Sequence, residues 1–189
     1  QYDLVVTDNV TFCSATASIT VTQNLNPPTL SVANPGQLTC TSPSQTLTGS
    51  SPTSGIQFSW ATISGPDTTI VGNGATLSVN SPGTYYLFGE NPANQCDNAT
   101  SVVVIANQTP PTADAGTPFT LDCAGETAAL NGSGTGAPNL GYQWSSVDGH
   151  FVSGANSASP LIDEAGTYSL LVTNPGNGCT ATSEVSILP

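Results

Sequence analysis

Apolar and polar residues alternate along many short stretches of this chain. Tyr2–Thr7 carries Tyr, Leu and Val at every second position, and Ala15–Thr22 repeats the alternation through Ala, Ile and Val. A period of two places apolar side chains on one face of a β-strand, so these stretches predict a hairpin. No stretch has the period of a helix, and 19 Gly and 15 Pro residues interrupt any longer run. The pattern predicts an all-β protein.

Between residues 28 and 107 the alternation predicts a series of short strands separated by turn signals such as Asn34-Pro35-Gly36. Such a series is typical of an antiparallel β-sandwich. Trp60 lies on the same face of its strand as Phe58, and Trp144 holds the matching place later in the chain. We expect both indole rings in a core. The expected strands are Leu30–Val32, Gln37–Cys40, Gln45–Thr48, Ile56–Ile63, Thr69–Val71, Thr76–Val79, one beginning at Gly83, and Thr100–Ala106.

The chain repeats itself at a constant interval, the one that separates Tyr85 from Tyr168. Gly83–Cys96 recurs as Gly166–Cys179, and Tyr2 and Cys13 hold the same places near the first residue. A fixed period of domain length indicates tandem structural modules. Paired prolines, which restrict the backbone to extended conformations, recur at the same interval and predict short, semi-rigid linkers between the modules.

The repeat predicts three segments. Residues 1–26 would be the last two strands of a preceding, truncated repeat, and residues 27–109 and 110–189 would be full repeats. A rival interpretation of the first segment is strand donation, in which the hairpin completes a neighbouring molecule.

The five cysteines follow the same period. The spacing between Cys40 and Cys96 equals the spacing between Cys123 and Cys179. The simplest pairing is one disulfide inside each full repeat, Cys40–Cys96 and Cys123–Cys179, with Cys13 unpaired in this segment. Disulfides imply an extracellular or cell-surface location in an oxidising compartment. A metal site is disfavoured, because the chain has no C-x-x-C sequence and a single His.

The charge excludes several classes of function. The chain has no Lys or Arg, 12 acidic residues and a net charge of −12. Binding to nucleic acid requires cations against phosphate, and the same holds for anionic membrane surfaces, so neither is expected. Membrane insertion is not expected either, because no apolar stretch approaches the roughly 18 residues of a spanning helix.

The sequence also argues against an enzyme. His150 follows a tight-turn signal, Asp148-Gly149, and has no counterpart in the first full repeat. A single His cannot serve a nucleophile–His–acid arrangement in both repeats. Asp163 and Glu164 are adjacent and are expected to point apart, which is unsuitable for a paired acid and base.

Calcium is a weaker possibility, and no other cofactor is expected. Asp114, Asp122 and Glu126 lie near each other in sequence and offer oxygen ligands, but they do not form a dense acidic loop and do not recur in the first repeat. Glycosylation is a further candidate modification, because Asn-x-Ser/Thr sequons occur at Asn9, Asn98, Asn107 and Asn131.

Several motifs carry a resemblance to known repeats. Pro110-Pro111-Thr112-Ala113-Asp114-Ala115-Gly116 and the strand Phe58–Pro66 resemble a PKD-type domain. The ending Gly166–Asn174 with its following Cys resembles the Ig-like and PKD-like repeats of large surface or secreted proteins of Bacteroidota. The resemblance implies tandem antiparallel β-sandwich spacers in adhesins, secreted enzymes or surface fibres. In that context Asp67-Thr68-Thr69 resembles an O-glycosylation motif, with Thr68 as the modified residue.

Two departures from antibody-type domains are expected. The disulfide would join an early strand to the last hairpin, near one end of the sandwich. The tyrosine corner would be absent, because Tyr85 stands too far before Cys96 in the sequence.

The expected function is a structural repeat of an extracellular fibre, filament or adhesin stalk. Its partners would be neighbouring repeats of the same longer chain or like subunits. One alternative is an adhesion module whose loop tips, Asn73–Ala75 or Ser153–Ser157, bind glycans or a protein. Another is a non-catalytic spacer of a large secreted enzyme.

Overall fold

The computed structural model describes residues 1–121 and 126–189 of the chain. Within these residues every regular element is a β-strand. No helix in the described ranges is long and apolar enough to cross a membrane. The all-β prediction is therefore confirmed.

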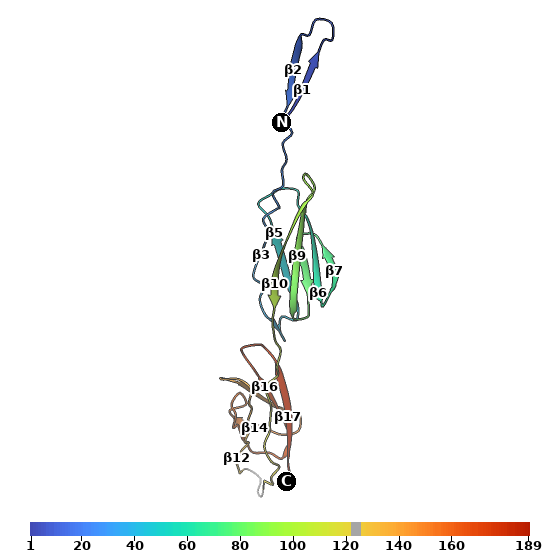
Figure 1. Cartoon of the computed structure of the whole chain (residues 1–189). Coiled ribbons are helices and arrows are strands. Elements are labelled where there is room, and N and C mark those ends of the chain that lie inside the picture. Colours follow the sequence, from blue (N-terminus) through green and yellow to red (C-terminus); the bar gives the residue numbers. More distant parts are fainter. Residues whose placement is uncertain (122–125) are drawn as a thin grey trace. The chain divides into compact units, whose positions relative to one another are not determined.

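The first element is a hairpin of β1 (Tyr2–Thr7) and β2 (Ser14–Ile19), which pair antiparallel from Tyr2 opposite Ile19 to Thr7 opposite Ser14 (Figure 1). The Oδ1 atom of Asp8 accepts the backbone N–H groups of Val10 at 2.7 Å and Thr11 at 3.0 Å, which shapes the turn. These bonds, with Thr11 the larger contributor, lower the pKa of Asp8. Both faces of the hairpin are exposed.

The first full repeat contains nine strands. The central sheet has the order β10-β9-β6-β7 (Figure 1). The other two sheets have the orders β3-β5-β8 and β11-β4. The strands are β3 (Ser31–Val32), β4 (Leu38–Thr39), β5 (Gln45–Ser50), β6 (Gln57–Ser64), β7 (Asp67–Asn73), β8 (Thr76–Val79), β9 (Gly83–Asn91), β10 (Cys96–Val104) and β11 (Ala106–Asn107).

The core around Trp60 shows why these strands pack. Trp60 lies opposite Leu87 in the antiparallel pair β6–β9, and both side chains are 0% exposed. Gly49 makes room for Leu87, because a Cβ at this glycine would overlap the leucine side chain. The indole N–H of Trp60 donates to the carbonyl oxygen of Gly74 at 3.1 Å, which satisfies the one polar atom of the ring.

The second repeat also folds into antiparallel sheets, but its strand β14 pairs with β15, whereas β7 of the first repeat pairs with β6. Its sheets have the orders β13-β16-β17 and β12-β15-β14. Trp144 is 4% exposed, and its indole N–H donates to the carbonyl oxygen of Ser157 at 3.0 Å, as Trp60 does in its own repeat. The core prediction for both Trp residues is confirmed. The strands are β12 (Ala128–Ala129), β13 (Gly141–Ser146), β14 (Phe151–Ser153), β15 (Leu161–Ile162), β16 (Gly166–Thr173) and β17 (Thr180–Ile187).

A bond of the tyrosine-corner kind is present, contrary to expectation. The hydroxyl of Tyr85 donates to the carbonyl oxygen of Ser81 at 3.0 Å, and that of Tyr168 donates to Glu164 at 2.7 Å. Each bond returns to the backbone a short way upstream, so its formation does not depend on where the cysteine lies. Burial is the main cause that raises the pKa of Tyr168.

The chain divides into two compact units. One contains residues 1–32, 48–75 and 86–101, and the other contains residues 33–47, 76–85 and 102–189. The second unit thus includes β4 and β11 together with the whole second repeat. The repeat boundaries at the paired prolines stay a prediction.

Candidate functional site: the cystine of the second compact unit

The described disulfide joins Cys40 to Cys179, two residues 139 apart in sequence, with a Cα–Cα distance of 5.0 Å. The predicted pairing of Cys40 with Cys96 is therefore wrong, and so is that of Cys179 with Cys123. Cys96 and the exposed Cys13 are free thiols. Cys123 lies outside the described residues.

Cys40 is positioned by the segment that leads out of the first repeat. Strand β4 pairs in parallel with β11, with Leu38 opposite Ala106. The backbone N–H of Leu38 donates to Ile105 at 2.9 Å, and the side-chain amide of Gln108 donates to the carbonyl oxygen of Thr39 at 3.2 Å. Cys40 follows immediately after β4, so its sulfur lies beside the segment that runs into the paired prolines.

Cys179 is positioned by the turn Asn174–Cys179, which we call the Cys179 turn. The N–H of Asn174 donates to Cys179 O at 2.8 Å, and the N–H of Gly178 donates to Asn174 O at 2.8 Å. Gly178 has a φ of +68°, a conformation that favours glycine. A Cβ at Gly178 would overlap the Thr41 side chain, so glycine also permits the close approach of the segment carrying Cys40.

Asn177 connects this turn to the linker. Its side-chain N–H group donates to the carbonyl oxygen of Thr109 at 3.0 Å and to Asn107 Oδ1 at 3.1 Å. Its Oδ1 accepts the N–H of Cys179 at 2.9 Å, and its backbone oxygen accepts the N–H of Cys40 at 3.1 Å. Asn177 is only 2% exposed, so each of these polar atoms needs its partner. The cystine and Asn177 thus join the segment that carries Cys40, residues 107–109 and the Cys179 turn within the second compact unit.

The failed pairing has a geometric cause. Cys40 lies beside residues that lead out of the first repeat, as shown above. Cys96 instead follows a turn in which the Asn94 side chain donates to the carbonyl oxygen of Asn26, in the segment that leads into that repeat, at 3.1 Å. The two cysteines are therefore held by different connecting segments.

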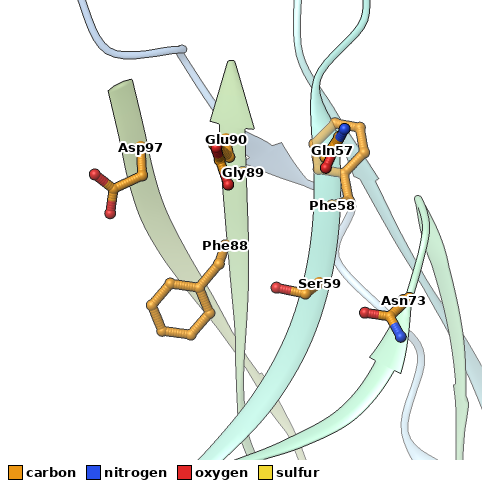
Figure 2. Close-up of a pocket in the computed structure, with 8 residues that line it drawn as sticks. All are labelled: Gln57, Phe58, Ser59, Asn73, Phe88, Gly89, Glu90 and Asp97. Carbon is orange, nitrogen blue, oxygen red and sulfur yellow. The ribbon is translucent and has the colours of Figure 1, made fainter. Parts of the chain in front are cut away.

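A shallow hollow of about 360 Å³ lies on the central sheet of the first repeat, over β6, β9 and β10 (Figure 2). Figure 2 shows the Phe88 ring below both Asp97 and Glu90. No cationic side chain lines the hollow, and it contains no thiol or imidazole that could act with a carboxylate in catalysis. Its lining residues are Gln57, Phe58, Ser59, Asn73, Phe88, Gly89, Glu90 and Asp97.

His150 forms the one side-chain ion pair within the described residues. Its Nδ1 lies 2.6 Å from Asp163 Oδ1, and the two side chains are 62% and 33% exposed. The hydrogen bond to Asp163, and next the charge of that carboxylate, raise the pKa of His150. Asp163 is thus engaged with His150, while the backbone of Glu164 accepts the Tyr168 hydroxyl.

The calcium candidates are not brought together in the described part of the chain. Asp114 Oδ1 accepts the N–H of Gly116 at 2.9 Å, Glu126 is exposed, and Asp122 lies outside the described residues. Within residues 1–121 and 126–189 no three His, Cys, Asp or Glu side chains form a metal-binding group.

The predicted glycosylation sites stay predictions, and their side chains are all exposed. Asn98 is already engaged, because its amide donates to the carbonyl oxygen of Pro28 at 2.8 Å. Asn107 likewise accepts from Asn177. The other three candidates are Asn9, Asn131 and Thr68.

Strand order, antiparallel pairing and the buried Trp of each repeat define the class of the fold: tandem antiparallel β-sandwiches of the Ig-like and PKD-like kind. No family model and no curated protein matches the chain. Several solved structures are similar to the chain. An I-band fragment of titin is 16% identical over 87% of this chain and 66% of the fragment, with a TM-score of 0.38.

Two further structures are similar to this chain. The three N-terminal domains of the bacteriophage RB49 outer capsid protein Hoc are 15% identical over 85% of this chain, with a TM-score of 0.42. The PKD domain of human KIAA0319 is 14% identical over 42% of this chain and 82% of that domain, with a TM-score of 0.31. The chain spans 59% of the Hoc fragment, so both multidomain fragments extend beyond its length.

Proposed function

We propose that this chain is a structural repeat module of an extracellular fibre, filament or adhesin stalk. The supporting observation is the cystine between Cys40 and Cys179, which joins residues belonging to two successive sequence repeats. A disulfide also favours an oxidising, extracellular location. The partners of such a module are neighbouring repeats or like subunits.

A mechanical role follows from what the cystine and Asn177 hold. Tension applied to a chain of modules acts first on the linkers between them, because these have the fewest contacts. Here the linker residue Thr109 is bonded to buried Asn177, and the covalent Cys40–Cys179 bond spans the paired prolines in the sequence. Stretching the linker therefore requires breaking a covalent bond rather than only hydrogen bonds.

The β1–β2 hairpin supports the proposal that residues 1–26 belong to a preceding repeat. Leu4 is 63% exposed, whereas its equivalents Leu87 and Leu170 are both 0% exposed. Tyr2 is 69% exposed, whereas its equivalent Tyr168 is 0% exposed. An isolated two-stranded hairpin is marginal in water, and this one has the apolar face of a core strand pair.

Electron microscopy of the native protein at the cell surface or in secreted material tests the proposed function. Immunogold labelling of this chain is expected to follow fibres or stalks. Labelling confined to soluble globular particles would contradict the proposal. Particles that carry a catalytic domain beside the repeats would instead identify a spacer of a secreted enzyme.

The hollow of Figure 2 favours a second candidate function, the binding of a glycan. Sugars bind to proteins through aromatic rings and through amide and carboxylate groups that accept or donate hydrogen bonds. Phe88, Gln57 and Glu90 supply these groups on one sheet face. Asn73, which belongs to one of the loop tips named from sequence, also lines the hollow. Glycan-array binding that is lost in Phe88→Ala but kept in Phe119→Ala would favour this function.

A further inference from the structure

The turn Asn91–Cys96, which we call the Cys96 turn, reproduces the main hydrogen bonds of the Cys179 turn. The N–H of Gln95 donates to Asn91 O at 2.8 Å, and the N–H of Cys96 donates to Asn94 Oδ1 at 3.0 Å. The corresponding distances in the Cys179 turn are 2.8 and 2.9 Å. Gln95 has a φ of +58°, close to the +68° of Gly178.

The contact with the linker is reproduced as well. The Asn94 side chain donates to the carbonyl oxygen of Asn26 at 3.1 Å, and the Asn177 side chain donates to that of Thr109 at 3.0 Å. Asn26 and Thr109 both precede a Pro-Pro pair and hold the same place in successive repeats. The two turns therefore stand in the same relation to equivalent linkers.

The two turns differ in whether another segment of the chain is bound to them. In the Cys179 turn the sulfur is bonded to Cys40, and the backbone oxygen of Asn177 accepts the N–H of Cys40 at 3.1 Å. In the Cys96 turn the sulfur is a free, partly exposed thiol that lies 3.8 Å from the backbone oxygen of Asn94. At the Cys179 turn the Cys179 sulfur and the Asn177 backbone oxygen bind Cys40. The Cys96 turn has the equivalent sulfur and the equivalent backbone oxygen of Asn94, but within the described residues neither is bonded to another segment.

We propose that Cys96 is the receiving residue of a second disulfide of the same kind, with a cysteine of a preceding unit of this repeat as its partner. The inference rests on the proposed function, because it treats the cystine as a device that recurs at successive linkers. The observation behind the inference is the Cys179 turn, where the equivalent cysteine forms a disulfide with Cys40.

Gln95 adds a requirement for that partner. At the Cys179 turn a Cβ in place of Gly178 would overlap the side chain of Thr41, the residue that follows Cys40. The Cys96 turn carries this Cβ, since residue 95 is glutamine. The partner cysteine must therefore be followed by a residue smaller than threonine, or the segments cannot approach as closely.

The β1–β2 hairpin identifies which unit supplies the partner. Its apolar residues Tyr2, Leu4 and Ile19 are each more than 60% exposed and match core positions of the later repeats. A unit that includes β1 and β2 as its last strands would cover them, and Asn24 and Asn26 would form its linker to the first full repeat. The partner cysteine accordingly lies earlier in the same polypeptide.

Formation of the bond is an oxidation. The Cys96 thiol and the partner thiol lose two protons and two electrons, and one sulfur–sulfur bond forms. The acceptor is the disulfide of a thiol–disulfide oxidoreductase, which is reduced to a dithiol. The same class of oxidant accounts for the Cys40–Cys179 bond.

Disulfide mapping of the native, full-length protein tests the inference. Free thiols are blocked with iodoacetamide, and the unreduced protein is digested with Glu-C and chymotrypsin, because the sequence offers no Lys or Arg for trypsin. We expect Cys96 to be joined to a peptide from earlier in the same polypeptide, with Gly, Ala or Ser after its cysteine. Recovery of alkylated Cys96, or of Cys96 joined to Cys13, would overturn the inference, as would attachment to a separate polypeptide that reduction releases.

A pair of variants sharpens the result. In Cys96→Ser the partner cysteine is expected to become fully alkylated, whereas in Cys13→Ser it is expected to stay protected. Alkylation in neither variant or in both would contradict the assignment. The measurement is independent of filament imaging, so failure of the proposed function and failure of this inference give different results.

Discussion

The hairpins β1–β2 and β16–β17 have the same register and opposite surroundings. Tyr2 lies opposite Ile19 in the first, and the equivalent Tyr168 lies opposite Val185 in the second. The first pair is more than 65% exposed, and the second is at most 3% exposed. Strand pairing in this repeat is therefore determined locally, by the alternation and the turn.

Burial is determined by what packs on the hairpin. The turns of both hairpins close in the same way, since the N–H of Phe12 donates to Asp8 O at 2.8 Å and that of Gly178 donates to Asn174 O at 2.8 Å. Of these two turns, only that of β16–β17 carries an asparagine that donates to the linker and a cysteine in a disulfide. The pairing of the two strands is thus encoded in the hairpin itself, whereas the burial of its apolar residues depends on neighbouring strands.

Removal of the Cys40–Cys179 bond is expected to have the largest effect. The chain-entropy relation gives about 5 kcal/mol for closing a loop of this length, so Cys40→Ser with Cys179→Ser should lower the free energy of unfolding by up to about that amount. In single-molecule stretching, the intact bond should withhold 139 residues, and reduction should lengthen the unfolded chain by about 480 Å.

The matched control is Cys13→Ser, which removes an exposed free thiol. Its free energy of unfolding should change by no more than about 0.5 kcal/mol. Equal losses in this control and in the double variant would show that the bond contributes nothing specific at its turn.

Truncation of equivalent leucines is expected to have the next largest effect. Leu170→Ala removes a fully buried side chain of β16 and should cost about 3 kcal/mol, as large-to-small core substitutions do. Leu4→Ala, at the equivalent place in β1, should change the free energy of unfolding of this chain by less than about 0.5 kcal/mol. Urea unfolding monitored by Trp fluorescence measures both. A large loss in Leu4→Ala would mean that β1 already packs against a core.

Much of the fold could be predicted from the sequence, because the alternation acts over a few residues. The structure has strands at Tyr2–Thr7 and Thr76–Val79, where the pattern places them. The indole rings lie in the cores for the same reason, since their strands present one apolar face.

The cysteine pairing could not be predicted, because the period makes every choice equally regular. Cys96 and Cys179 hold the same place in successive repeats, so Cys40 stands at a regular interval from both. Spacing alone cannot distinguish a partner in the same repeat from one in the next. Two residues could have indicated the pairing. Gly178 leaves room for the Thr41 side chain, and the Asn177 side chain donates a hydrogen bond to Thr109 in the linker.

The smallest expected effect concerns His150, which has no counterpart in the first repeat. Its hydrogen bond to Asp163 raises its pKa in the folded state above the ordinary value of 6.5. The stabilisation from this pair is therefore fully present below pH 6.5, and it is lost as the pH rises through the raised pKa of the folded state. Because the imidazole is largely exposed, solvent keeps the effect small.

Proton NMR titration of the single His measures this pKa directly. Asp163→Asn removes the charge and should bring the pKa back toward 6.5, whereas Asp67→Asn, in the first repeat, should leave it unchanged. The melting temperature of the wild type should fall slightly across the titration, and that of Asp163→Asn should not. A pKa of about 6.5 in the wild type would show that the His150–Asp163 pair does not persist in solution. The second repeat would then have no ion pair to distinguish it from the first.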